Sequence, residues 1–299
     1  MHKLICLVAA AGLALAACGD DAKPIILASG QDGPYSVAVD ATHVYWTNRR
    51  GGEIMKVPLS GGTPVFLAEG SEPGGIAVDS THVYWTTCSG GEVLKMPLDG
   101  GDPVTLANGQ CPEDIAVDAT HVYWVDYESG EVMKVPLAGG NPVTLASGQD
   151  KPGFIVVDPT HVYWTNDNGE LGGGEVMKVP LAGGTPFTLA DGQDLPGGIA
   201  VDSTHVYWAN HAGAEVMKVP LTGGDPITIA AGTITPYGIA VDATHVYWTT
   251  LAGEVMKVPL AGGEPVVLAA GQNAPSDIAI DATHVYWADR SGQVMKVRK

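Results

Sequence analysis

The segment Thr42-His43-Val44-Tyr45-Trp46 decides the fold, because the chain of 299 residues repeats this pentapeptide seven times. The spacings between successive copies are 39, 39, 40, 44, 40 and 39 residues, and the copies contain all seven tryptophans. A constant period of about 20–50 residues is typical of architectures in which each repeat forms one supersecondary unit. The histidines of the copies are His43, His82, His121, His161, His205, His245 and His284.

Each repeat contains four short runs rich in β-branched and aromatic residues, bounded by turn residues. In the second repeat these runs cover residues 76–78, 83–86, 92–96 and 104–107. An Asp-x-Thr-His turn suits the first connection, since Asp can accept nearby backbone N–H bonds. Gly pairs such as Gly61-Gly62 supply the positive φ of a tight turn at the third connection, between the third and fourth runs. We therefore expect each repeat to form a four-stranded antiparallel sheet.

Apolar residues occupy both faces of these runs, so each sheet must be covered on both sides. Radial packing of sheets around an axis, as in a β-propeller, satisfies this requirement. A fourth-strand segment precedes the first complete repeat at residues 24–28, whereas the last repeat ends with its third strand at 294–299. The sequence therefore predicts an all-β fold, a seven-bladed β-propeller over residues 24–299, with its last blade closed by the N-terminal strand.

Residues 75–79, 83–86, 93–95 and 98–101 resemble the YWTD repeat, also called the low-density-lipoprotein-receptor class B repeat. The resemblance covers nearly all of residues 24–299 and implies a propeller used as a platform for binding proteins or other ligands. The family usually has six blades, and the Asp of its motif is kept here only at Asp126 and Asp289. The organisation also resembles seven-bladed lyases of the streptogramin-inactivating type and propeller lactonases.

The N-terminal segment resembles a targeting sequence. An apolar run over residues 4–14 is too short to span a bilayer, which needs about 20 residues, and Leu15-Ala16-Ala17-Cys18 follows it. This tetrapeptide resembles the lipobox of bacterial lipoproteins. It implies a signal peptide over residues 1–17, lipidation of Cys18 and a tether over 18–23. Gly19 then favours the outer membrane of a bacterial cell envelope, and an ordinary secretory signal is the alternative.

The composition restricts the partners. A formal net charge of −18 makes binding to nucleic-acid phosphates unfavourable. The same charge suits solubility, a cationic partner or cation binding. No phosphate-binding loop, nucleophile elbow or Cys/His zinc spacing occurs in the sequence. We expect a monomer without an obligatory cofactor.

The repeats differ from one another mainly in the connections between the second and third strands and in those between blades. In an up-and-down blade both connections lie on one face, which suggests a binding face; drift of exposed loops is the alternative. Aromatic residues fall on this face, and three of them lie near the mouth of the central channel. They are expected either to anchor a ligand there or to plug the channel: Tyr35, Tyr127, Phe154 and Tyr237.

Acidic residues share this face, among them Glu113, Asp114, Asp126 and Asp277. Carboxylates converging on the axis could hold Ca²⁺, although no compact calcium-loop spacing is present and a solvated acidic rim is the alternative. The predicted ligand-binding set is Tyr35, Glu113, Asp114, Asp126, Tyr127, Phe154, Tyr237 and Asp277.

Cys88 and Cys111 lie on the same face at one blade boundary. In an oxidising compartment they are expected to form a disulfide that closes a loop of roughly 20 residues and contributes about 3 kcal/mol. A pair of reactive thiols is the alternative. The repeated histidines are expected to make hydrogen bonds between strands or blades. The lysine of each third strand, such as Lys95, is expected to be exposed and to pair with the preceding Glu.

Two functional hypotheses follow. The preferred one is a non-catalytic envelope lipoprotein whose propeller face binds a protein, peptide or glycan. The alternative is a metal-assisted lyase or lactonase in which His211, the one histidine of the mature chain outside the repeats, acts as general base beside axial carboxylates. A structural or assembly factor of the envelope is a third possibility.

Overall fold

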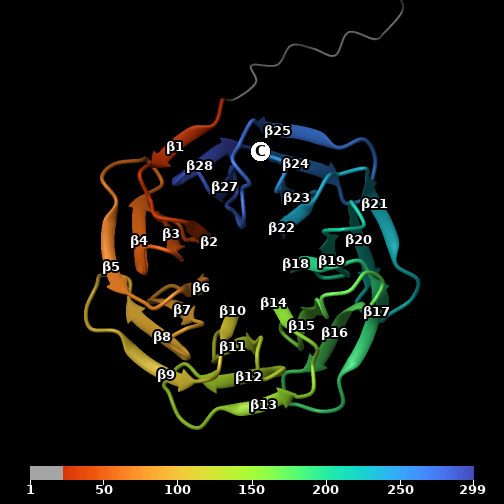
Figure 1. Cartoon of the computed structure of the whole chain (residues 1–299), viewed down its shortest axis with the longest axis horizontal. Helices are drawn as coiled ribbons and strands as arrows, with labels where there is room; N and C mark the ends of the chain where they lie inside the picture. Colours follow the sequence, from red (N-terminus) through yellow and green to blue (C-terminus); the bar gives the residue numbers. More distant parts are fainter. Residues whose placement is uncertain (1–22) are drawn as a thin grey trace, which may run out of the picture.

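The computed structural model describes residues 23–299 as seven four-stranded antiparallel sheets around a central channel (Figure 1). The predicted signal peptide and the lipidation site Cys18 lie outside the described residues. Within residues 23–299 there is no helix, and therefore none that could cross a membrane. From the innermost strand outward, the blades are β2 (Pro34–Val39), β3 (His43–Asn48), β4 (Glu53–Pro58), β5 (Val65–Glu69); β6 (Pro73–Val78), β7 (His82–Thr87), β8 (Glu92–Pro97), β9 (Val104–Asn108); β10 (Pro112–Val117), β11 (His121–Asp126), β12 (Glu131–Pro136), β13 (Val143–Ala146); β14 (Pro152–Val157), β15 (His161–Asn166), β16 (Gly174–Pro180), β17 (Phe187–Gln193); β18 (Pro196–Val201), β19 (His205–Asn210), β20 (Glu215–Pro220), β21 (Ile227–Ala231); β22 (Pro236–Val241), β23 (His245–Thr250), β24 (Glu254–Pro259), β25 (Val266–Ala270); and β26 (Ile278–Ile280), β27 (His284–Asp289), β28 (Gln293–Arg298), β1 (Ile25–Ala28).

The predicted closure of the ring is confirmed. β1 is the outermost strand of the last blade and pairs antiparallel with β28, with Ile25 opposite Lys296 and Ile26 opposite Met295. The first and last strands of the described chain thus share one sheet, and backbone hydrogen bonds hold the ring shut.

The hydrophobic core lies between the blades. Adjacent residues of a strand point to opposite faces of the sheet, so the Tyr and Trp of each repeat enter different layers. Tyr45 of the first blade packs in the same layer as Trp85 of the second, and Tyr286 of the last blade packs with Trp46 of the first. Each of the seven layers contains the Tyr of one blade and the Trp of the next. The repeated segment therefore covers both faces of every blade.

The turns on the constant face are held by their aspartates. Asp40 Oδ1 accepts hydrogen bonds from the N–H of Thr42 (2.6 Å) and of His43 (2.7 Å), and Oδ2 accepts one from the hydroxyl of Tyr45 (2.8 Å). Desolvation opposes ionisation of Asp40, but these bonds outweigh it and lower its pKa. The His43 ring bonds Thr42 Oγ1 within its own turn, and the other six repeat histidines bond their preceding threonines in the same way. Within residues 23–299 these rings make none of the expected hydrogen bonds to another strand or blade. The aspartates of the seven turns are Asp40, Asp79, Asp118, Asp158, Asp202, Asp242 and Asp281.

The prediction for the strand lysines was wrong. Lys95 Nζ donates a hydrogen bond to the carbonyl of Leu137 in the next blade (2.5 Å). The turn of the neighbouring blade comes within reach of the lysine, and a backbone carbonyl at this boundary needs a donor. The lysines that make this bond between blades are Lys56, Lys95, Lys134, Lys178, Lys218 and Lys296.

Candidate binding site at the channel mouth

Two positions of the repeat build the mouth of the channel. The first is the pair of residues after the proline at or just before the start of each innermost strand. Six of the eight predicted ligand-binding residues fall on this pair. In chain order the pairs are Tyr35-Ser36, Gly74-Gly75, Glu113-Asp114, Gly153-Phe154, Gly197-Gly198, Tyr237-Gly238 and Ser276-Asp277.

The second position is the residue directly after the second strand of each blade. It differs in charge and size from blade to blade, although the strand before it barely changes. Its side chains therefore give each sector of the mouth its own chemistry. In chain order these residues are Arg49, Cys88, Tyr127, Asp167, His211, Leu251 and Arg290.

Aromatic side chains form a floor at the mouth. The hydroxyl of Tyr35 donates to Glu113 Oε1 (3.0 Å) and lies 3.5 Å from that of Tyr237. The ring of Phe154 meets Tyr237 edge-on at 5.5 Å. Desolvation, with Tyr237 and Glu113 nearby, raises the pKa of Tyr35 well above its ordinary value, so its hydroxyl remains a donor. The hydroxyls of Tyr35 and Tyr237 thus meet at the mouth of the channel. The ligand anchor and the plug both stay predictions.

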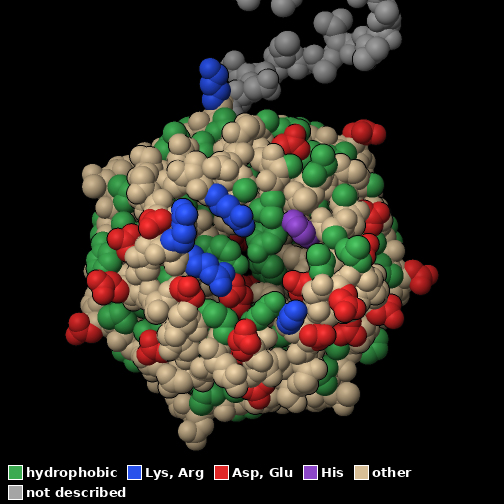
Figure 2. Space-filling model, viewed as in Figure 1, with side chains coloured by type: hydrophobic (Ala, Val, Ile, Leu, Met, Phe, Trp, Pro, Cys, Tyr) green, Lys and Arg blue, Asp and Glu red, His purple; other side chains and the backbone are tan. Residues whose placement is uncertain are grey.

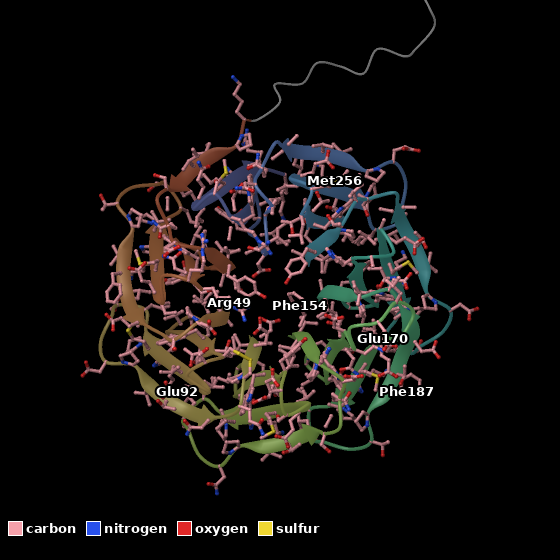
Figure 3. The ribbon with its side chains drawn as sticks, viewed as in Figure 1. Arg49, Glu92, Phe154, Glu170, Phe187 and Met256 are labelled. Carbon is pink, nitrogen blue, oxygen red and sulfur yellow. A yellow bond between two sulfur atoms is a disulfide. The ribbon has the colours of Figure 1, made fainter. Side chains whose placement is uncertain are left out.

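An ion pair crosses this floor. Arg49 Nη1 and Nη2 donate to Glu113 Oε1 and Oε2 at 2.6 and 2.9 Å, and the guanidinium lies 4.6 Å from the ring centre of Tyr35. Desolvation opposes the charge of Arg49, but the hydrogen bonds to Glu113 outweigh it and raise its pKa. Figure 3 shows Arg49 and Phe154 at the central opening. The pair fixes Glu113 in a bidentate geometry.

Below the floor lies a cavity of about 150 Å³ whose lining includes Asp114 and Asp277. Asp277 Oδ2 accepts hydrogen bonds from Ser36 Oγ (2.7 Å) and the N–H of Val37 (3.0 Å), and Asp114 Oδ2 accepts one from the N–H of Ile155 (2.9 Å). Desolvation inside the channel raises the pKa of Asp114 to about 8, and the nearby Asp277 adds to this effect. Desolvation also raises the pKa of Asp277. Both acids lie inside the channel, beneath the aromatic floor.

Asp126 is not brought to the mouth. Its side chain is buried and accepts hydrogen bonds from the backbone N–H groups of Gln110 (2.8 Å), Cys111 (3.2 Å) and Ser129 (3.1 Å), so it holds two loops together. The carboxylates predicted to converge on calcium do not form a three-ligand cluster among residues 23–299. The one such cluster there joins Glu113 to Cys88 and Cys111. The calcium site stays a prediction.

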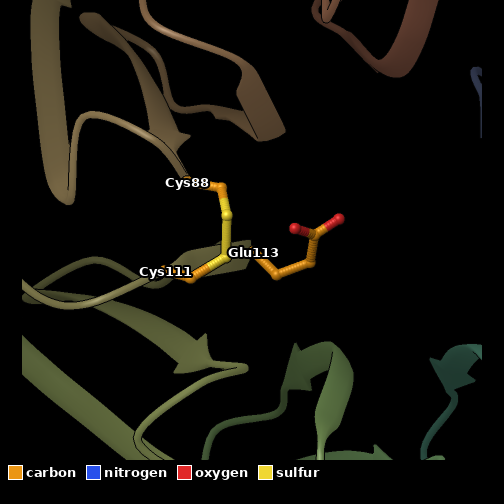
Figure 4. A group of neighbouring side chains, drawn as sticks. All are labelled: Cys88, Cys111 and Glu113. Carbon is orange, nitrogen blue, oxygen red and sulfur yellow. A yellow bond between two sulfur atoms is a disulfide. The ribbon is translucent and has the colours of Figure 1, made fainter.

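The predicted disulfide is confirmed: Cys88, after β7, is bonded to Cys111, before β10. Figure 4 shows the bridge between the second and third blades, with the carboxylate of Glu113 directed away from it. Both sulfurs are used in the bond, so the cluster with Glu113 offers no thiolate to a metal.

Two depressions flank the floor. The disulfide pocket, of about 330 Å³, is lined by the disulfide, Tyr127, Phe154, Glu128 and Asp167 together with floor residues. The arginine pocket, of about 520 Å³, is lined by Gly33, Pro34, Tyr35, Arg49, Arg50, Tyr237 and Arg290. Figure 2 shows cationic side chains gathered on one side of the central depression.

The face was expected to be acidic, but Arg49, Arg50 and Arg290 line one of its two pockets, and Glu113, Glu128 and Asp167 line the other together with Arg49. Sequence reasoning missed Arg49, Asp167 and Arg290. The signal was available, because these residues occupy the same repeat position as Tyr127 and His211.

His211 lies at the mouth rather than at the outer rim. Its ring is 6.1 Å from that of Tyr237, edge to face. Its Nδ1 is buried and has no hydrogen-bond partner among the described residues. No carboxylate of that part of the chain bonds to it, so the His–acid arrangement of a general base is not formed.

No family model matches the chain, and no curated protein matches its sequence. Solved structures share its fold. Virginiamycin B lyase from Staphylococcus aureus is 14% identical, with 93% of this chain and 98% of that chain covered and a TM-score of 0.80. The hydrazine synthase of Kuenenia stuttgartiensis is 13% identical, with 91% and 97% covered and a TM-score of 0.78. A chain of a nidogen/laminin complex is 23% identical, with 74% and 90% covered and a TM-score of 0.62. At these identities the likeness establishes a β-propeller that occurs in enzymes and in a protein complex alike.

Proposed function

We propose that this protein is a non-catalytic lipoprotein of the bacterial envelope, anchored to the outer membrane through Cys18, whose channel mouth binds a protein or peptide. The observation that carries the proposal is the pair of pockets sharing one aromatic floor, on a scaffold whose blades are otherwise nearly identical. Side chains that vary on a rigid scaffold are typical of binding surfaces.

The disulfide pocket indicates the chemistry of the partner. Tyr127 and Phe154 offer aromatic surface, whereas Glu128 and Asp167 offer negative charge at the same depression. An apolar side chain beside a cationic group, as on a basic peptide segment, complements both features. The disulfide joins two loops of this wall and reduces the ordering that binding would require.

The likeness to a chain of the nidogen/laminin complex supports this use of the fold, because that propeller occurs in an assembly of proteins. The resemblance to YWTD repeats also supports a binding function.

The test is capture of partners from envelope extracts by the immobilised mature protein. Phe154→Ala and Tyr127→Ala should reduce capture at least about tenfold, as truncation of an aromatic anchor does. The matched control is Phe187→Ala, because Phe187 is exposed on the outer rim (Figure 3). Equal capture by all three variants and the native protein would refute the proposal. Capture that survives proteolysis of the extract but not glycosidase treatment would make the partner a glycan.

The anchor has its own test. Cys18→Ser should move the protein from the membrane fraction to the soluble fraction and abolish labelling by radioactive palmitate. Unchanged fractionation would remove the lipoprotein part of the proposal and leave the binding site untouched.

A metal-assisted lyase or lactonase is the second candidate, favoured by the position of His211 against Tyr237 and by the fold shared with virginiamycin B lyase. It predicts turnover of virginiamycin B or of a lactone in the presence of Mg²⁺ or Ca²⁺. His211→Ala should abolish that turnover. No turnover by the native protein with either ion would exclude these reactions.

A further inference from the structure

Arginine is rare in this chain and is concentrated at one place. The chain has four arginines, and three of them, Arg49, Arg50 and Arg290, line the arginine pocket. They come from the first and last blades, which meet where the ring closes. A protein with a net charge of −18 thus carries a local group of cations beside its channel mouth.

These arginines have hydrogen-bond donors to spare. A guanidinium has five N–H donors, and Arg49 uses only one on each terminal nitrogen for Glu113. Arg50 is exposed and lies 3.3 Å from the equally exposed Asp32, in an ion pair that solvent weakens. Arg290 is exposed, and no carboxylate within residues 23–299 forms an ion pair with it.

The pocket itself contains no acid. Its remaining lining is Gly33, Pro34, Tyr35 and Tyr237, which contribute a neutral turn and two phenol rings. Glu113 binds Arg49 from the side of the disulfide pocket, where it is a lining residue. Arg50 and Arg290 therefore line a depression that has no acidic lining residue, and the carboxylate paired with Arg50 is that of the exposed Asp32 outside this lining.

We propose that the arginine pocket is an oxyanion-binding site, which takes the carboxylate or phosphate of a small ligand whose flat or apolar part contacts Tyr35 and Tyr237. Guanidinium groups match both oxyanions in bidentate geometry and bind them more strongly than neutral donors do. A volume of about 520 Å³ lies within the usual range of small-molecule sites. The site does not depend on the partner proposed above, because a free anion can occupy it alone.

The small number of arginines allows a direct test by nuclear magnetic resonance. The side-chain Nε–H signals of four arginines are followed while inorganic phosphate, acetate or benzoate is added at constant ionic strength, with chloride as the reference. The signals of Arg50 and Arg290 should move saturably. The signal of Arg298 should not move, because Arg298 lies opposite His284 in the register of β27 and β28, at the other end of the last blade from Arg290. Tighter binding of benzoate than of acetate and phosphate would identify a carboxylate on an apolar body, and tighter binding of phosphate would identify a phosphate ligand.

Substitutions complete the test. Arg50→Gln and Arg290→Gln should each weaken anion binding by about tenfold, as expected for loss of a charge-assisted contact. Arg298→Gln should leave it unchanged. All three positions are exposed, so melting temperatures should match that of the native protein. The proposal fails if no anion shifts the signals beyond chloride, if Arg298 responds like the others, or if Arg290→Gln binds as tightly as the native chain.

Discussion

Asp114 is half-buried in the lining of the channel cavity, and desolvation there changes the chemistry of its carboxyl group. With a folded pKa of about 8, against about 4 when unfolded, Asp114 holds its proton over a range in which the unfolded chain has lost it. Between these two values the folded state binds more protons, so the free energy of unfolding falls as the pH rises. Below about pH 4 Asp114 is protonated in both the folded and the unfolded state, so it no longer makes the free energy of unfolding depend on pH.

Asp114→Asn should therefore stabilise the protein by at least about 1 kcal/mol at pH 8 and have little effect at pH 4. The amide keeps an oxygen that can accept the N–H of Ile155. Urea unfolding at both pH values measures the difference. Asp102→Asn, at an exposed turn, is the control. If the difference in stability between Asp114→Asn and the native chain does not depend on pH, the raised pKa of Asp114 is refuted.

Glycines at the mouth show how little space the innermost strands leave. A Cβ at Gly198 would lie 2.6 Å from the carbonyl oxygen of Tyr237 and 2.9 Å from the nitrogen of Ile239, whereas a Cβ at Gly153 would meet nothing within 4 Å. Gly198→Ala should cost about 1–3 kcal/mol because backbone must move. Gly153→Ala should be neutral or slightly stabilising. Thermal melting of the two variants compares them directly, and equal losses would refute this account.

At the scale of strands and turns, the blades are joined by lysines as well as by aromatic layers. Lys95 on β8 bonds a carbonyl of the next blade, whereas the equivalent Lys257 on β24 makes no such bond within residues 23–299. Lys95→Met should lower the free energy of unfolding by about 1 kcal/mol, the usual net value of such a bond.

Lys257→Met is the matched control and should cost less, because both lysines are partly buried but only one bonds across the boundary. Chemical unfolding followed by tryptophan fluorescence suits the comparison, since each layer contains one tryptophan. If the two variants lose the same stability, the hydrogen bond between blades contributes nothing measurable.

For the whole molecule, the closing strand β1 decides whether seven sheets form a ring. Deleting residues 24–28 removes the pairing with β28 and the buried side chain of Leu27. Unfolding should then lose its cooperativity, because the last blade would have an open edge.

Leu27→Ala keeps the strand and should cost only about 2–4 kcal/mol, the range for such a truncation in a core. Urea transitions followed by fluorescence and by circular dichroism should coincide for Leu27→Ala and separate for the deletion. Coincident transitions for the deletion would show that the ring does not need its closing strand.

The sequence by itself determined the seven blades, their strand order, the closure by β1 and the disulfide. The blades, their strand order and the closure follow from a repeat whose period, turn residues and incomplete last copy are local in the chain. The disulfide follows from the two cysteines that the repeat places on one face at one blade boundary. The sequence also predicted six residues of the channel mouth, since they occupy the two repeat positions after the proline of each innermost strand.

The tertiary structure decided which of these residues meet and what surrounds them. Only the ring brings Arg49 from the first blade to Glu113 of the third, and Tyr35 to Tyr237 across the channel. It encloses Asp114, buries Asp126 between loops and gathers arginines from the two ends of the chain. Such contacts depend on the radius and closure of seven packed sheets, and the pattern within one repeat carries no information about its neighbours across the channel.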